Sequence, residues 1–131
     1  IKDGTIDCIS SAHEPCHKHE KEVEFDLAPA GVTGYETALS VVLGELAKNM
    51  DDPFPLITKL MSLNPSRILE VDNTIAEGRM ANLFVFDPNS NWRYNASQGR
   101  SAAKNSPYEG FDMKGSVMMT FSNGKRVFNL I

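Results

Sequence analysis

Thr5-Ile6-Asp7-Cys8-Ile9-Ser10 runs directly into Ser11-Ala12-His13-Glu14-Pro15-Cys16-His17, and this junction determines how the rest of the chain is interpreted. Apolar and polar residues alternate over the first run, which predicts a short strand. A polar loop follows to residue 24, and a second loop, interrupted by Gly and Pro, covers residues 25–34. Strand, loop and helix in this order form a βα unit, in which catalytic residues commonly lie on the loops that leave the carboxyl ends of strands.

The strongest periodic signal predicts a helix that ends near Asn49. Its apolar residues recur at the i, i+4, i+7, i+8, i+11 spacing of one helical face: Tyr35, Leu39, Val42, Leu43 and Leu46. Prolines interrupt the chain after it, and further helical turns are expected around residues 57–61. Asn64 is then expected to cap a new helix that reaches Leu69, with Pro65 at the first helical position, where its missing N–H costs nothing.

The remaining sequence has the pattern of strands. Residues 83–86 predict a buried strand closed by Asp87-Pro88. Asn123-Gly124 lies between two further apolar runs, which is a strong hairpin signal; the runs are residues 117–121 and 126–130. The polar segment 89–114 is expected to be mostly loop, with one edge strand around Trp92.

Length and composition exclude several classes of protein. At 131 residues the chain has the size of one domain, and 41% hydrophobic with 23% charged residues is typical of a globular chain rather than a disordered one. A net charge of -4 without a Lys/Arg cluster argues against nucleic-acid binding, and the apolar stretches are too short to span a membrane. Two cysteines form no disulfide framework, so a cytoplasmic location is expected. Because Ile1 is no start methionine, we expect a piece of a longer protein.

Every histidine and cysteine of the chain lies between residues 8 and 19, which raises the possibility of a zinc site. The candidate ligands are Cys8, His13, Cys16, His17 and His19. Structural zinc sites usually combine two ligand pairs that are a dozen or more residues apart, whereas these candidates crowd into one loop. Cys8 also alternates with Ile6 and is expected to be buried. Two other interpretations stay open: a loop that forms part of an active site, and a solvated loop that is merely rich in histidine.

The order of motifs resembles the carboxy-terminal part of dihydroorotase, the cyclic amidohydrolase of pyrimidine biosynthesis. The resemblance is carried, in sequence order, by Asp3-Gly4-Thr5-Ile6-Asp7, the His-Pro loop, Phe25-Asp26-Leu27-Ala28-Pro29-Ala30-Gly31, Gly34-Tyr35-Glu36-Thr37-Ala38-Leu39, Asn64-Pro65-Ser66-Arg67-Ile68-Leu69, Ile75-Ala76-Glu77-Gly78, Leu83-Phe84-Val85-Phe86-Asp87-Pro88, Asn105-Ser106-Pro107-Tyr108 and Gly115-Ser116-Val117. It extends over nearly the whole chain and includes the final hairpin.

The resemblance implies an α/β fold followed by β structure. Residues 1–70 would be the last strand, its loop and the closing helices of a metal-dependent-hydrolase (β/α)8 barrel. Residues 71–131 would be the carboxy-terminal part of a small β-sandwich. Because a complete barrel of this kind takes about 250 residues, most of it would lie outside this chain.

The resemblance also implies the reaction, the reversible hydrolysis of dihydroorotate to carbamoyl aspartate by a zinc-dependent enzyme. The family pattern Asp-His-Ala-Pro-His corresponds here to Ala12-His13-Glu14-Pro15-Cys16, followed by His17. Ala12 occupies the slot of the aspartate that binds metal and moves the proton, and Glu14 is a weak substitute. We therefore expect this segment to contain no catalytic residue and to bind no metal. The residues expected to contact substrate are His13, Cys16, His17, Ala30 and Gly31.

Two hypotheses follow for the parent protein. The first is a working dihydroorotase with a variant last-strand motif. The second, favoured by Ala12, is a non-catalytic homologue that acts as a structural partner of aspartate carbamoyltransferase. Under either hypothesis we expect the isolated segment to be inactive. We also expect it to associate with itself, because its first strand would lack parallel neighbours.

Overall fold

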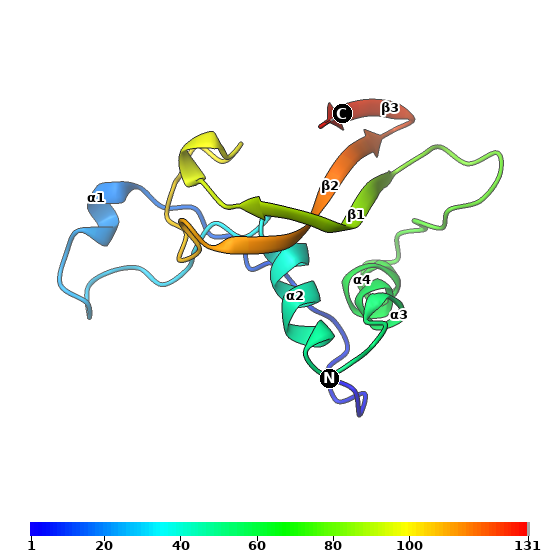
Figure 1. Ribbon diagram of the computed structural model, residues 1–131, viewed down its shortest axis with the longest axis horizontal. Coiled ribbons are helices and arrows are strands. Elements are labelled where there is room, and N and C mark those ends of the chain that lie inside the picture. Colours follow the sequence, from blue (N-terminus) through cyan, green and yellow to red (C-terminus); the bar gives the residue numbers. More distant parts are fainter. Residues whose placement is uncertain (131) are drawn as a thin grey trace.

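The computed structural model describes residues 1–130, and a three-stranded antiparallel sheet lies at its centre (Figure 1). The strands are β1 (Leu83–Arg93), β2 (Asp112–Ser122) and β3 (Lys125–Asn129), in the order β1-β2-β3. The predicted hairpin is confirmed as β2 and β3. Asn123 and Gly124 have φ angles of 49° and 73°, as a two-residue turn between twisted strands requires.

Strand β1 is longer than the sequence predicts. The expected stop at Asp87-Pro88 is wrong, because β1 continues to Arg93 and includes the predicted edge strand at Trp92. The pairing with β2 is irregular between Asp87 and Asn91, and an irregularity of this kind accommodates a proline that has no N–H to donate. The prediction of a buried strand is also wrong: Phe84 and Val85 are 53% and 42% exposed.

Helix α2 (Ala38–Ala47) packs against β2 (Figure 1). It begins later than predicted, since Tyr35 lies outside it and is exposed, whereas Leu43 is buried as expected. Gly115, in the left-handed region at φ 81°, permits the close approach: a Cβ there would lie 2.9 Å from Leu43 Cδ2 and 2.3 Å from Phe86 Cζ. Its carbonyl accepts hydrogen bonds from Ser40 Oγ and Trp92 Nε1, both at 2.8 Å.

The next helical segment is continuous from residue 54 to residue 68. It consists of α3 (Phe54–Thr58), the π-helical turn η1 (Lys59–Leu63) and α4 (Asn64–Ile68). The predicted fresh start at Asn64 is wrong, because Asn64 is already helical and its Nδ2 donates to the Asp7 carbonyl (2.7 Å). The wider π turn precedes Pro65, which cannot supply the usual helical N–H.

The strand predicted over residues 5–10 is not formed. This segment runs extended without a sheet, and Ile9 N–H donates to the Leu60 carbonyl (2.9 Å). A parallel strand needs a neighbour to complete its ladder, and within residues 1–130 the single parallel bridge joins His13 to Val32. Cys8 is consequently exposed rather than buried, which corrects the expectation.

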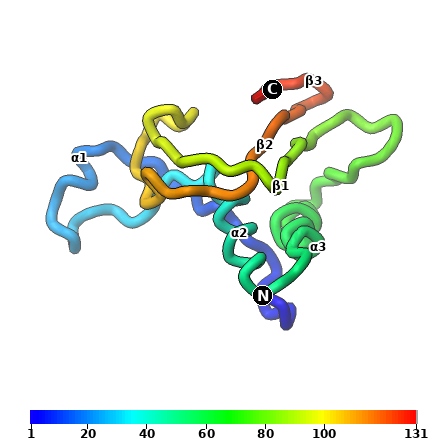
Figure 2. Tube along the Cα trace, viewed as in Figure 1, coloured from blue at the N-terminus to red at the C-terminus, as the bar shows by residue number. Residues whose placement is uncertain are grey.

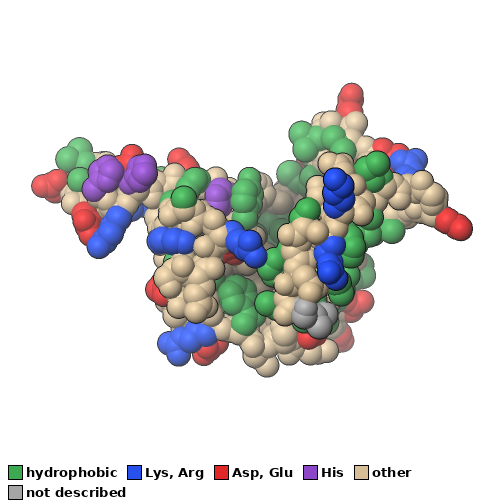
Figure 3. Space-filling view, turned by 90° about the horizontal axis from the view of Figure 1, so that it is seen from above, with side chains coloured by type: hydrophobic (Ala, Val, Ile, Leu, Met, Phe, Trp, Pro, Cys, Tyr) green, Lys and Arg blue, Asp and Glu red, His purple; other side chains and the backbone are tan. Residues whose placement is uncertain are grey.

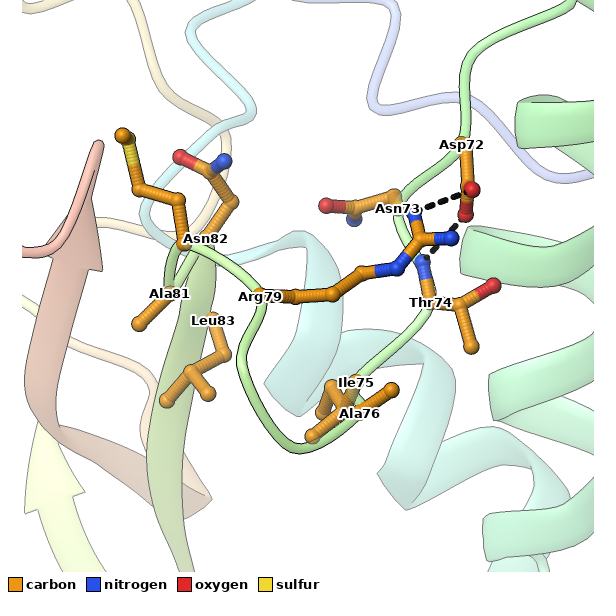
Figure 4. Close-up of a pocket in the computed structure, with 10 residues that line it drawn as sticks. Asp72, Asn73, Thr74, Ile75, Ala76, Arg79, Ala81, Asn82 and Leu83 are labelled. Carbon is orange, nitrogen blue, oxygen red and sulfur yellow. Dashed lines mark hydrogen bonds and ion pairs between the residues drawn. The ribbon is translucent and has the colours of Figure 1, made fainter.

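A long loop connects α4 to β1 and encloses a hollow of about 420 Å³ (Figure 4). Arg79 crosses the loop and forms an ion pair with Asp72, whose Oδ1 also accepts from Thr74 N–H (3.1 Å). The hydrogen bonds from Thr74, with Arg79 adding to them, hold the pKa of Asp72 below its ordinary value. Within residues 1–130, no helix has the length and apolar character needed to cross a bilayer.

Candidate functional site

The two loops that carry the predicted site residues lie side by side. The parallel bridge between His13 and Val32 joins them, and Glu14 N–H donates to the Val32 carbonyl (2.8 Å). Both loops extend away from the sheet in the same arm of the molecule (Figure 2). The short helix α1 (Lys18–Lys21) belongs to this arm. The structure thereby brings His13 and Glu14 next to Ala30 and Gly31, residues that are 16 or more positions away in sequence.

His13 is held in one orientation by the backbone at the end of the second loop. Its Nδ1 accepts from the N–H groups of Gly34 (3.2 Å) and Tyr35 (3.4 Å). Its ring stacks on Tyr35 with a centroid separation of 4.0 Å and an interplanar angle of 3°. An Nδ1 that accepts leaves the proton on Nε2 of the neutral ring. His13 therefore presents an Nε2–H donor that has no hydrogen-bond partner within residues 1–130.

Ala12 and Glu14, the two positions that bear on catalysis, have different surroundings. Ala12 is exposed and lies in the left-handed region at φ 46°, and its methyl group can neither ligate a metal nor carry a proton. The Glu14 carboxyl group lies over the backbone of Gly31: a Cβ on Gly31 would be 2.3 Å from Glu14 Oε2. Gly31 has a φ of 90°, so the absence of a side chain permits both the turn and this contact.

Cys16 and His17 have different surroundings. Cys16 is half-buried, and its N–H donates to Asn105 Oδ1 (3.2 Å). His17 is exposed, precedes α1 and stacks with His19 at 5.4 Å. Figure 3 shows one pair of histidines on the projecting arm and the third apart from them. The structure thus places Cys16, and not His17, against the segment that carries Asn105.

The five cysteine and histidine side chains do not form a zinc site. Among residues 1–130, no group of three or more His, Cys, Asp or Glu side chains is placed to hold a metal ion. His13 Nδ1 is occupied by backbone N–H groups, and the pair formed by His17 and His19 lies in the exposed arm. The cysteine and histidine side chains of residues 1–130 therefore do not fit a zinc ion.

A cavity of about 330 Å³ opens beside His13. Its lining combines the second loop with the segment after β1: His13, Thr33, Tyr35, Glu36, Tyr94, Arg100 and Ser101. Thr33 is buried, and its Oγ1 has no hydrogen-bond partner. Glu36 is oriented by accepting from Arg100 N–H. Aside from His13, none of these residues was predicted as a site residue, because the segment around residue 100 is polar loop without a periodic signal.

Two side chains that brace the loops were also missed. Lys21 Nζ donates to the carbonyls of Pro29 (2.5 Å) and Gly31 (3.0 Å). Asn105 contacts both loops with its side chain. Asn105 is part of a motif that carries the family resemblance, but a single sequence contains no signal for the contact it makes across 74 to 91 positions.

Comparison with curated proteins identifies dihydroorotases among the relatives of this chain. A dihydroorotase from Acetivibrio thermocellus is 39% identical over 128 residues, and one from Elusimicrobium minutum is 40% identical over 126 residues. These alignments cover 97% and 95% of this chain. The chain is homologous to part of dihydroorotase. It spans about 30% of the length of these relatives. No family model matches it.

Solved structures support the same fold for this part of a dihydroorotase-like chain. A D-hydantoinase from Thermus sp. superimposes with a TM-score of 0.83 at 20% identity, and one from Bacillus sp. AR9 with 0.82 at 22%. Each match covers 97% of this chain and 29% of the other. The predicted fold class is confirmed: helical and loop segments are followed by antiparallel strands, in the arrangement found in one part of a D-hydantoinase.

Proposed function

We propose that this chain is the carboxy-terminal portion of a dihydroorotase-like amidohydrolase. Residues 1–70 would close the (β/α)8 barrel and residues 71–131 would contribute to the β-sandwich. The order of the elements supports this division, because the α-helices precede the strands along the chain, as does the segment 5–10, which lacks partners to pair with in a parallel sheet. The parent would catalyse the reversible hydrolysis of the ring amide of dihydroorotate to carbamoyl aspartate.

In the parent, this chain would form one wall of the substrate site. The observation that carries this proposal is the parallel bridge between His13 and Val32, which holds the two loops of the family resemblance together. His13 supplies an Nε2–H, and the N–H groups of Ala30 and Gly31 have no acceptor within residues 1–130. Oriented N–H donors of this kind bind a carboxylate. The substrate carboxylate would therefore lie between these groups.

The segment by itself would be inactive. Position 12 carries a methyl group where the family has its proton-carrying aspartate, and the Glu14 carboxyl group lies over Gly31. Zinc, which the family resemblance implies for the parent, would be held by residues outside this chain. Catalytic groups tolerate only small errors in position, so a carboxylate displaced along the loop supplies little of the lost activity.

A second candidate function is that of a non-catalytic homologue that acts as a structural partner of aspartate carbamoyltransferase. Ala12 favours it, since a site can keep its substrate-binding backbone after losing its proton carrier. The bridge between the two loops is present in the structure. Near Ala12, His13 Nδ1 accepts from the N–H groups of Gly34 and Tyr35, and the Glu14 carboxyl group lies over Gly31.

The test is an activity assay of the full-length parent in both reaction directions, with Ala12→Asp alongside. Cyclisation of carbamoyl aspartate by the wild type would establish the enzyme and exclude the structural role. An inactive wild type that gains activity on Ala12→Asp would establish a non-catalytic homologue with an intact binding wall. Inactivity of both proteins, without binding of dihydroorotate, would contradict the proposal.

A further inference from the structure

The side chain of Asn105 joins the two candidate substrate-binding loops to each other. Its Oδ1 accepts from Cys16 N–H in the first loop at 3.2 Å. Its Nδ2 donates to the Glu14 carbonyl in the first loop at 3.1 Å and to the Gly31 carbonyl in the second at 3.4 Å. Asn105 itself lies far along the chain, between η2 (Ala96–Gln98) and β2. One residue from the second half of the molecule thus contacts both loops.

The backbone of Asn105 adds a further bond to the second loop. Thr33 N–H donates to the Asn105 carbonyl at 3.0 Å. Between the loops themselves, the bridge at His13 and Val32 provides direct pairing. Asn105 therefore adds a third segment to the short parallel contact between the loops. Residues 14–16 of the first loop and residues 31–33 of the second loop both form hydrogen bonds with it.

The chemistry at this position requires an amide. The side chain meets one N–H group and two carbonyl oxygens, so it must accept on one atom and donate on the other, which asparagine does. An aspartate of the same shape would keep the bond from Cys16 but would place a charged oxygen against the carbonyls of Glu14 and Gly31. Leaving a half-buried polar group without its hydrogen-bond partner costs more free energy than the hydrogen bond itself contributes to stability.

We propose that Asn105 is a positioning residue that fixes the spacing of the His13 loop and the Ala30-Gly31 loop, and through it the geometry of carboxylate binding. This inference rests on the proposed function of those loops. Asn105 need not touch the substrate. It acts through the backbone of Glu14, Cys16 and Gly31. These residues belong to the two loops that present the donors, which are His13 Nε2–H and the N–H groups of Ala30 and Gly31.

The test compares Asn105→Ala and Asn105→Asp in the full-length parent with Asn82→Ala as a control. Asn82 Oδ1 also accepts a backbone N–H, that of Asn123 at 2.8 Å, but at the β2–β3 turn, away from both loops. Hydrogen exchange followed by mass spectrometry reports residues 14–17 and 29–33, and calorimetry reports the affinity for dihydroorotate and for carbamoyl aspartate.

We expect Asn105→Ala to speed exchange in both loops and to weaken ligand binding about three- to tenfold, the loss expected for one or two net hydrogen bonds. In Asn105→Asp, Cys16 should keep its protection, while Thr33 N–H, which donates to the Asn105 carbonyl, should exchange faster because the charged oxygen repels the Gly31 carbonyl. Asn82→Ala should change neither loop nor affinity.

Unchanged exchange in both loops of a folded Asn105→Ala protein would overturn the inference. So would faster exchange with unchanged affinity for both ligands, because the loops would then move without affecting binding. Absence of binding by the wild type would count against the proposed function alone, and the exchange data would still decide whether Asn105 joins the loops.

Discussion

At the scale of single residues, position 12 decides how the chain is interpreted chemically. The backbone there lies in the left-handed region, with φ at 46°, and the side chain is exposed. Aspartate and asparagine populate this region several-fold more often than most other residues, and β-branched residues avoid it. The local fold therefore still suits the aspartate of the family pattern, although the residue present is alanine.

The left-handed backbone at position 12 leads to a prediction for stability. Ala12→Asp should change the free energy of unfolding of the parent by no more than about 0.5 kcal/mol, as expected for a tolerated surface substitution. Ala12→Val should cost about 1 to 2 kcal/mol, because a β-branched side chain is strained at positive φ. Urea unfolding of both variants measures the difference, and equal costs would show that position 12 is not left-handed in solution.

Asp72 provides a prediction for pH. Hydrogen bonds from Thr74, and then the Arg79 ion pair, lower its pKa in the folded chain. The stabilisation of the loop is therefore present above the unfolded pKa of about 3.9 and is lost as the pH falls through the lower folded value. A carboxyl NMR titration should find the midpoint below 3.9, and Arg79→Gln should restore only part of the difference. A midpoint at or above 3.9 would contradict the loop geometry.

At the scale of elements, the contact between α2 and the sheet depends on Gly115. Gly115→Ala adds a methyl group that would lie 2.3 Å from Phe86 Cζ and 2.9 Å from Leu43 Cδ2. Gly78 has a similar φ of 79°, but nothing lies within 4 Å of its position, so Gly78→Ala carries the backbone strain alone.

Gly115→Ala should therefore destabilise the fold by about 1 to 3 kcal/mol more than Gly78→Ala, the range for overpacking a core. Thermal or urea unfolding of the two variants in the parent measures this difference. Equal losses would mean that α2 does not approach β2 as closely as described.

The elements that could be predicted from sequence are those with strong local signals. The Asn123-Gly124 turn and the periodic run around Leu43 predict the existence of β2, β3 and α2 but not their bounds, since β2 begins at Asp112, earlier than expected, and α2 begins at Ala38, later than expected. The errors at residues 5–10, Asp87 and Asn64 have a common cause: each depends on a distant partner, namely a missing strand neighbour, an irregular pairing or a contact with Asp7. The same applies to the site, where His13 and Gly31 were predicted but the Asn105 bridge was not.

At the scale of the whole molecule, the described chain leaves much apolar surface uncovered. Exposed side chains occur on the second loop, after α4 and on β1, including Phe25 at 98%, Leu69 at 71% and Phe84 at 53%. These side chains lie on separate segments, and large apolar side chains this exposed are available for contacts with another chain or another part of the same protein. In the proposed parent, the rest of the barrel and sandwich would cover it.

We therefore expect the isolated 131-residue chain to associate at micromolar concentration, and the full-length parent to bury these side chains. Size-exclusion chromatography with light scattering measures the association, and Phe25→Ser with Leu69→Ser should reduce it. A monodisperse monomer that is catalytically active would contradict both the fragment interpretation and the expected inactivity.

The central claim is that the two bridged loops form the carboxylate-binding wall of a dihydroorotase-like site. A crystal structure of the full-length parent with dihydroorotate bound tests it most directly. We expect the substrate carboxylate within about 3.2 Å of His13 Nε2 and of the N–H of Ala30 or Gly31, the distance of an ordinary N–H···O hydrogen bond. A carboxylate bound elsewhere, with these donors facing solvent or another part of the protein, would contradict it.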